Sequence, residues 1–166
     1  RRIGCSVSGV AQFITKNGMG ELQNWLETGY DTIQKWDNQY SDWFAVPKSI
    51  KTTSVKPSGT VSLLVGATPG MHYPESRFYI RRMRLSKHSE LLEPLKKANY
   101  PLEPAFGSED TTMVVEVPVD VGEGIRTAGE LSVWEQFSLA AFLQRHWADN
   151  QVSCTATFNP ETEADQ

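Results

Sequence analysis

Two periods of apolar residues alternate along this chain, and their alternation is the feature that most constrains its fold. Spacings of three and four residues predict helices over 3–14, 22–43, 86–99 and 133–147. A period of two predicts strands over 52–56, 77–85, 113–119 and 152–158. Strands that alternate with helices are typical of βαβ units, so the sequence predicts an α/β fold with a mostly parallel sheet and no clear domain boundary.

Local signals mark where several of these elements begin and end. Asn17-Gly18 ends the first helix, and Ser132 with Glu135 forms a capping box that opens the last one. The last helix is apolar over a broad face, so we expect it to be well buried. A stripe of aromatic and apolar side chains at helical spacing is most often core, and we interpret this one as core rather than as a cofactor box: Leu22, Trp25, Leu26, Tyr30, Ile33, Trp36, Tyr40 and Trp43.

Composition limits the classes of protein to which the chain can belong. Its 166 residues carry a net charge of −4, which argues against a general nucleic-acid-coating protein. No apolar run approaches the ~20 residues of a membrane-spanning helix, and no secretory signal opens the sequence. Cys5 and Cys154 match neither a disulfide scaffold nor a zinc site, so we expect a cytoplasmic protein without a membrane partner.

The strongest local signal for binding is the turn Pro57-Ser58-Gly59-Thr60, which follows a strand and precedes a short helix over 61–65. A glycine at such a turn lets backbone amides approach an anion, and the hydroxyls of Ser58 and Thr60 add donors to phosphate oxygens. Lys56 supplies a positive charge if it points to the same site. An ordinary turn with Ser58 as a helix cap is an equally good interpretation of this pattern. The Walker motif is absent, so a P-loop enzyme is not indicated.

Four arginines on the strand over 77–85 suggest a second kind of binding: Arg77, Arg81, Arg82 and Arg84. Alternation along a strand places Arg81 on the face opposite Arg82 and Arg84, so the four do not form one patch. We therefore expect most of them to form salt bridges to neighbouring helices. A non-catalytic nucleic-acid-binding module that uses this strand is the alternative, although the acidic composition speaks against it.

The histidines and cysteines do not identify a catalytic group. His88 and His146 are expected near helix surfaces, and both cysteines are expected to be small buried hydrophobic residues. His72 lies in the loop 66–74, which is rich in glycine and proline, and α/β proteins often bind ligands at such loops. A polar loop residue is its more ordinary interpretation. From pattern alone we name no acid, base, nucleophile or metal ligand.

Five motifs stand in order along the chain, at 2–10, 55–62, 66–72, 79–84 and 149–155. Together they resemble the large chain of ribonucleotide reductases, and in particular the monomeric adenosylcobalamin-dependent (class II) ribonucleoside-triphosphate reductases. The resemblance runs from Arg2 to Phe158, and the order of the motifs makes it specific.

The resemblance implies a fold and two sets of site residues. It implies that residues 1–158 are a C-terminal portion of the family's ten-stranded α/β barrel. The acidic composition of 159–166 predicts a disordered tail after it. The resemblance favours substrate-phosphate binding by Pro57, Ser58, Gly59 and Thr60. It also implies contacts with adenosylcobalamin, whose corrin holds cobalt, for Thr68, Pro69, Gly70, Met71 and His72.

The family reduces ribonucleoside triphosphates by thiyl-radical chemistry, with thioredoxin or a similar dithiol as reductant and a deoxynucleotide as effector. Its radical cysteine lies in an Asn-x-Cys-x-Glu segment, which this sequence lacks, and neither Cys5 nor Cys154 falls on a catalytic motif. We therefore expect a fragment that begins inside a helix and is inactive alone, with its catalytic cysteines and effector site outside this segment. The alternative enzyme is another phosphate-binding α/β nucleotide enzyme.

Overall fold

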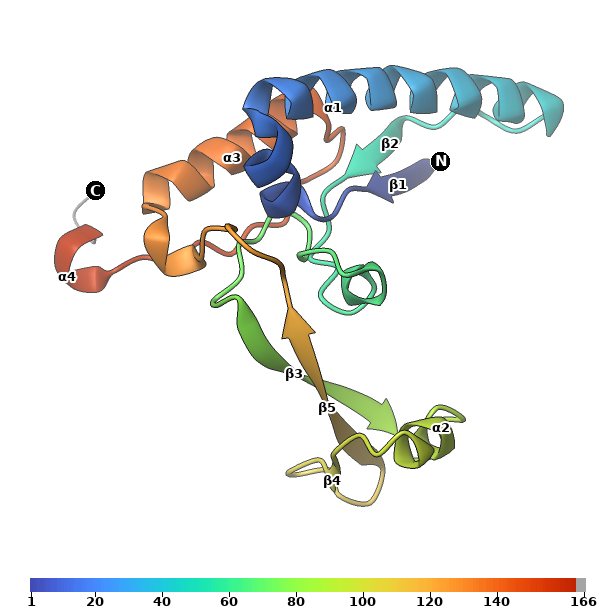
Figure 1. Ribbon diagram of the computed structural model, residues 1–166. Helices are drawn as coiled ribbons and strands as arrows, with labels where there is room; N and C mark the ends of the chain where they lie inside the picture. The colour runs from blue at the N-terminus through green and yellow to red at the C-terminus, as the bar shows by residue number, and fades with distance from the viewer. Residues whose placement is uncertain (164–166) are drawn as a thin grey trace. The chain divides into compact units, whose positions relative to one another are not determined.

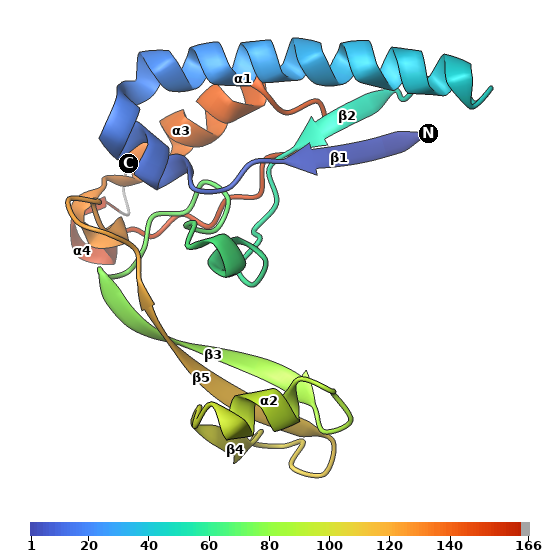
Figure 2. The same cartoon turned by 45° about the vertical axis from the view of Figure 1, so that its right-hand side comes forward.

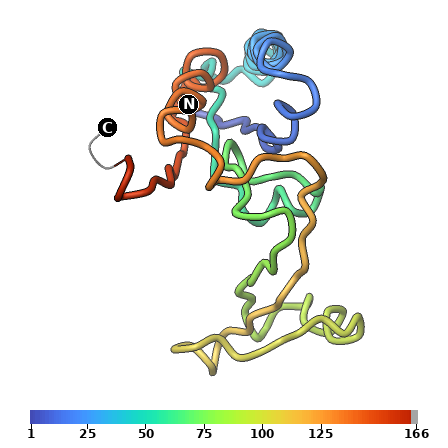
Figure 3. Tube along the Cα trace, turned by 60° about the vertical axis from the view of Figure 1, so that its left-hand side comes forward, coloured from blue at the N-terminus to red at the C-terminus, as the bar shows by residue number. Residues whose placement is uncertain are grey.

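The computed structural model describes residues 1–163, which form two compact units. The first unit combines residues 1–76 with the described residues from Val121 onward, and the second is Arg77–Asp120. The second unit is thus an insertion, which the chain enters after residue 76 and leaves before residue 121 (Figure 3). No helix among the described residues is both long and apolar enough to cross a membrane.

Parallel strands and helices build the first unit (Figure 1). Its elements are β1 (Arg2–Ser6), α1 (Val10–Trp43), β2 (Lys51–Ser54), η1 (Ser62–Val65), η2 (Ala128–Glu130), α3 (Val133–His146) and α4 (Pro160–Glu163). Strands β1 and β2 are parallel, with Ser6 opposite Ser54. Beyond β2, Val55 forms one parallel bridge with Val152. The parallel arrangement predicted from the sequence is confirmed for these strands.

Two elements of this unit differ from the sequence prediction. Residues 2–6 form a strand rather than the start of a helix, because their backbone pairs with β2. Helix α1 begins only after Gly9, whose φ of 74° turns the chain. The predicted strand over 152–158 is limited to the bridge at Val152. The backbone amides of Thr155 and Thr157 donate hydrogen bonds to the side chains of His72 and Gln136, and not to a neighbouring strand.

Helix α1 is interrupted at Gly18, whose φ of 81° and ψ of 170° are not helical. The predicted break at Asn17-Gly18 is therefore confirmed. The hydrophobic core lies where α1, α3 and the end of β2 meet, and its buried members are Val10, Leu22, Leu26, Val55, Met71, Leu139, Leu143, Trp147 and Ala148.

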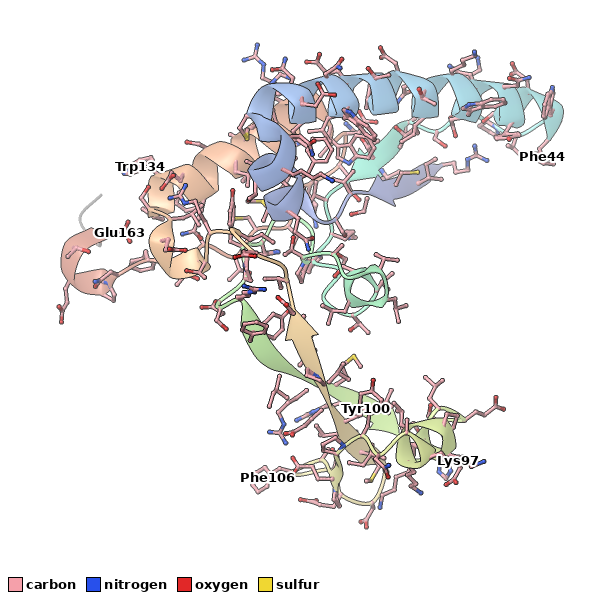
Figure 4. All side chains as sticks on the ribbon, viewed as in Figure 1. Phe44, Lys97, Tyr100, Phe106, Trp134 and Glu163 are labelled. Carbon is pink, nitrogen blue, oxygen red and sulfur yellow. The ribbon has the colours of Figure 1, made fainter. Side chains whose placement is uncertain are left out.

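The interpretation of the whole aromatic stripe of α1 as core is wrong. Leu22 and Leu26 are buried, but Trp25 is 63% exposed and Trp43 is 64% exposed. At the end of the helix, exposed rings contact one another instead: Tyr40 stacks on Trp36 and on Phe44 and meets Trp43 edge to face. Figure 4 shows Phe44 at the far end of α1. The helical spacing was correct, but among the described residues only part of the stripe packs against the core, with Leu22 and Leu26 buried and Tyr30 and Ile33 partly buried.

The capping box of α3 is confirmed, because the Ser132 hydroxyl accepts from the Glu135 amide at 3.2 Å and the Glu135 carboxylate accepts from the Ser132 amide at 3.0 Å. Helix α3 buries one face only. Trp134, which is labelled in Figure 4, is 56% exposed, so the expectation of broad burial was wrong. In the expected disordered tail, Pro160–Glu163 forms the short helix α4, and residues 164–166 lie outside the described residues.

The second unit is a three-stranded antiparallel sheet with one short helix (Figure 2). Its elements are β3 (Phe78–Ser86), α2 (Leu92–Lys97), β4 (Leu102–Pro104) and β5 (Thr112–Asp120), with strand order β3-β5-β4. The predicted strands over 77–85 and 113–119 are confirmed, but their antiparallel pairing contradicts a mostly parallel sheet. The helix expected over 86–99 is shorter because successive turns occupy its first residues, and Pro94 lies in the first turn of α2.

Candidate functional site

The candidate phosphate turn, residues 57–60, lies just beyond the carboxyl ends of the parallel strands β1 and β2. Ser6, the last residue of β1, accepts a hydrogen bond from the Lys56 amide at 2.9 Å through its hydroxyl. The carboxyl ends of parallel strands are where open α/β sheets place ligands. The fold therefore puts the turn at the edge of the sheet where proteins of this class bind ligands.

The Ser58 side chain points into the protein rather than outward. Its φ of 43° is left-handed, and its hydroxyl accepts from the Gly70 amide at 3.0 Å. The same hydroxyl shares a hydrogen bond with the Ser8 hydroxyl, at 2.6 Å between the two oxygens. The Ser58 carbonyl also accepts from the Ser62 amide at 3.0 Å. Ser58 is thus an internal support of the turn.

Among the residues that the structure describes, the unpaired donors of the turn are backbone amides and the Thr60 hydroxyl. Within the described part of the chain, the amides of Gly59, Thr60 and Val61 donate no hydrogen bond. Thr60 is exposed and its hydroxyl is free of partners among the same residues, and the neighbouring Lys56 is exposed as well. Successive free amides form a concave donor surface for anions. This arrangement can bind a phosphate without any charged side chain at its centre.

The loop 66–72 is fastened to the start of α1, chiefly by Gln12. The Gln12 side chain donates to the carbonyls of Gly66 and Val121, both at 2.9 Å, and accepts from the Thr68 amide at 2.8 Å. The Gly9 amide donates to the Thr68 carbonyl at 2.8 Å. Sequence reasoning missed Gln12, and a polar residue on the first turn of a helix that follows a glycine was its only signal.

Gly70 is the point where this loop touches the segment that leads into the turn. Its φ is 52°, and a Cβ built on it would lie 2.4 Å from the Lys56 carbonyl oxygen. No real side chain tolerates that distance. The fold thus brings together two of the motifs that carry the resemblance, the turn and the loop. Their Gly70–Ser58 hydrogen bond joins residues 12 positions apart in the sequence.

Most of the candidate cofactor residues are buried. Thr68, Gly70 and Met71 are buried, whereas Pro69 and His72 are half-buried. The Thr68 hydroxyl is buried without a hydrogen-bond partner among the described residues. Only Pro69 and His72 therefore present side-chain surface to a ligand.

His72 connects the loop to the 149–155 motif. Its Nε2 accepts from the Thr155 amide at 3.0 Å, so Nδ1 carries the proton and donates to the Pro69 carbonyl at 3.2 Å. A small pocket beside it is lined by Met71, His72, Tyr73, Cys154 and Thr155, among others. The same motif is anchored at its other end, where Asp149 accepts from the Thr52 amide at 3.0 Å.

The two cysteines occupy different surroundings. Cys5 is exposed on β1, so the expectation that it is buried was wrong. Cys154 packs against the core, and burial raises the pKa of its thiol. His146 packs against α1 through a 2.8 Å contact with Glu27, rather than lying at a free helix surface.

Two of the four arginines in residues 77–84 pair with acidic groups, whereas the Arg81 Nε is buried without a hydrogen-bond partner among the described residues. Arg82 pairs with Glu103 and Glu116, and Arg77 pairs with Asp120 at 3.2 Å. Salt bridges were expected, but these carboxylates belong to strands rather than to helices. The unit carries seven basic and seven acidic side chains, a balance that speaks against a nucleic-acid-binding surface.

Known proteins resemble the chain in sequence and in fold, although no protein-family model matches it. An adenosylcobalamin-dependent ribonucleoside-triphosphate reductase of Euglena gracilis is 60% identical over 98% of this chain, and a probable one of Dictyostelium discoideum is 58% identical over all of it. A reductase of the same name from Levilactobacillus brevis is 40% identical over 97% of the chain.

A solved structure supports the same assignment. The crystal structure of a B12-dependent (class II) ribonucleotide reductase matches 99% of this chain with a TM-score of 0.77 and 34% identity. The chain spans only 22% of the first two relatives, 25% of the third and 27% of the solved chain. The resemblance found in the motifs is confirmed, and so is an α/β fold of this type. By sequence and fold, the chain belongs to the adenosylcobalamin-dependent ribonucleoside-triphosphate reductase family.

Proposed function

We propose that this chain supplies the substrate-phosphate site of an enzyme that reduces ribonucleoside triphosphates to deoxyribonucleoside triphosphates. The observation that carries the proposal is the row of free amides at Gly59, Thr60 and Val61, beyond the carboxyl ends of two parallel strands. A triphosphate is a strong acceptor for such amides, and the exposed Lys56 adds a positive charge nearby.

The four residues of the turn take different roles in this proposal. Gly59 and Thr60 contact the phosphates, through their amides and the Thr60 hydroxyl. Ser58 acts from behind, since its hydroxyl is already bonded to Ser8 and Gly70. Pro57 fixes the entry of the chain into the turn.

The loop 66–72 fits the edge of an adenosylcobalamin site, but not a complete one. Pro69 and His72 offer side-chain surface to a corrin, while Thr68, Gly70 and Met71 are buried and hold the loop in place. His72 is occupied at both ring nitrogens, so it orients the loop rather than offering a free nitrogen to a metal. When bound, adenosylcobalamin supplies the radical that starts the reduction. The residues of this chain contribute binding and orientation.

The remaining partners follow from the same proposal. We assign no catalytic cysteine to this chain, and we propose that residues 1–158 contribute to the catalytic barrel while 159–166 form its acidic extension. A deoxynucleotide effector binds outside these residues. Thioredoxin or a similar dithiol protein supplies the electrons, in a cytoplasmic setting that suits two free cysteines.

The test is the affinity of ribonucleoside triphosphates for a full-length reductase that carries this segment and the substitution Thr60→Val. Loss of one hydrogen bond to a charged group costs about 1.5–3 kcal/mol, so the dissociation constant for CTP should rise at least about tenfold. Cytidine, which has no phosphate, should bind equally to both forms. Thr32→Val is the matched control, because Thr32 is an exposed threonine on α1 whose hydroxyl bonds only the Thr28 carbonyl.

Two results would contradict the proposal. One is an unchanged affinity for CTP in the Thr60→Val reductase. The other is an equal loss of affinity for CTP and cytidine, which would show that the substitution acts on the nucleoside portion or on the fold rather than on phosphate binding.

A further inference from the structure

We infer that Ser8 is a positioning residue that couples nucleotide binding at the turn 57–60 to cofactor binding at the loop 66–72. This inference rests on the proposed function of both segments. Ser8 lies outside both segments, on the connection between β1 and α1.

The first step is the hydrogen-bond arrangement around Ser58. Its hydroxyl accepts from the Gly70 amide, at 3.0 Å, and lies 2.6 Å from the Ser8 hydroxyl. One oxygen therefore joins the turn, the loop and the β1–α1 connection. Because either serine can donate in the short contact, removal of the Ser8 hydroxyl leaves Ser58 free to rotate away from Gly70.

The second step is that the β1–α1 connection holds the loop independently of the turn. The Gly9 amide donates to the Thr68 carbonyl at 2.8 Å, and the Val10 amide donates to the Gly70 carbonyl at 3.4 Å. Gln12 adds its contacts with Gly66 and Thr68. The loop is thus fixed on one side by residues 9–12 and on the other by Ser58, and Ser8 links these two sides.

The third step is the close approach of the backbones at Gly70. An ideal Cβ on Gly70 would lie only 2.4 Å from the Lys56 carbonyl oxygen, so the loop already lies against the segment that enters the turn, and the Gly70–Ser58 hydrogen bond joins the two. A phosphate that fixes residues 59–61 therefore restricts Ser58 and, through it, the loop. Two ligands that order one shared network bind with positive cooperativity, and the coupling is reciprocal.

The experiment measures the dissociation constant of adenosylcobalamin for the full-length reductase with and without saturating CTP. The reductase is oxidised beforehand and no dithiol reductant is present, so no electrons are available for turnover. We expect CTP to tighten cofactor binding by about 3- to 10-fold, the worth of about one neutral hydrogen bond. Ser8→Ala should reduce this ratio to nearly 1, whereas Ser8→Thr, which keeps a hydroxyl, should retain most of it.

Ser138→Ala is the matched control, since Ser138 is an exposed serine on α3 with no hydrogen bond through its side chain among the described residues. It should leave the ratio unchanged. The midpoint of chemical unfolding, measured for each variant, separates loss of coupling from loss of fold. In a variant that couples the two ligands normally, adding the cofactor should tighten CTP binding by the same factor by which CTP tightens cofactor binding.

The inference is overturned if CTP leaves the cofactor affinity of the unsubstituted reductase unchanged, or if Ser8→Ala retains the full ratio. Failure of the proposed function looks different. In that case, Thr60→Val does not weaken CTP binding at all, whatever the coupling ratio of the Ser8 variants.

Discussion

Replacement of Gly70 by alanine tests whether the close contact between the loop and the turn organises the site. Gly70 and Gly66 lie in the same loop with similar left-handed φ angles, 52° and 66°. They differ in their surroundings. A Cβ on Gly66 meets nothing within 4 Å, whereas a Cβ on Gly70 would be 2.4 Å from the Lys56 carbonyl oxygen. Gly66→Ala is therefore a control that carries the backbone strain without the collision.

The expected magnitudes follow from these two geometries. A left-handed alanine costs about 1 kcal/mol, and this penalty applies to both variants. In Gly70→Ala the loop must also move back from Lys56, because real Cβ contacts essentially never fall below 3.0 Å. That movement weakens the hydrogen bonds from the Gly70 amide to Ser58 and from the Val10 amide to Gly70, each worth about 1 kcal/mol. Gly70→Ala should therefore cost about 2 kcal/mol more than Gly66→Ala.

The assay has two readouts on the purified full-length reductase. Urea unfolding followed by tryptophan fluorescence reports the free energy of unfolding, with the buried Trp147 as a reporter beside the loop. CTP binding reports the turn, and Gly70→Ala should weaken it whereas Gly66→Ala should not. If both variants lose the same stability and bind CTP equally well, the contact at Gly70 does not organise the site and the reasoning is refuted.

Two further predictions concern ionisable groups. Iodoacetamide should modify the exposed Cys5 faster than Cys154, whose thiol has a pKa raised by burial; peptide mass spectrometry would check the order, and faster labelling of Cys154 would contradict the described packing. The Arg126 guanidinium and the Ser132 amide lower the pKa of Glu135 from 4.5 to about 2, so this carboxylate stabilises the fold above about pH 4.5 and loses that effect as the pH falls toward 2. Glu135→Gln should therefore lower the midpoint of unfolding at pH 7. At pH 2 to 3 the midpoints of the variant and of the unsubstituted protein should lie closer together. If the two midpoints differ by the same amount from pH 7 down to pH 2, the Glu135 carboxylate is not the cause of the difference.

Sequence patterns predicted those parts of the fold that local chemistry determines. The capping box at Ser132, the break at Gly18 and the alternation of β3 and β5 were all confirmed, because each depends on neighbouring residues alone. The direction in which strands pair was harder to predict from the sequence. Alternation does not distinguish a parallel from an antiparallel neighbour, so the sheet of the second unit was assigned the wrong direction.

Burial was the other limit of the sequence prediction. The spacing of Trp25 and Trp43 correctly places them on a helix, but burial depends on what packs against that helix, and period alone carries no such information. Cys5 was misplaced for the same reason. An apolar or small residue in a short strand is buried only if another element covers that strand.

At the candidate site, the sequence identified the turn and the loop but not the contacts between them. The motif around Ser58 suggested a hydroxyl directed at a phosphate, whereas that hydroxyl bonds Ser8 and Gly70. Contacts across 50 and 12 residues have no local signature. The free amides of residues 59–61 were likewise invisible in the sequence, because a backbone donor is free only when no other part of the fold accepts from it.

The most direct test of the account is a crystal structure of a full-length reductase carrying this segment with a bound ribonucleoside triphosphate. We expect phosphate oxygens within about 2.7–3.2 Å of the amide nitrogens of Gly59, Thr60 and Val61, with the Ser58 hydroxyl still bonded to the Gly70 amide. Triphosphate density elsewhere, with these three amides facing solvent, would contradict it.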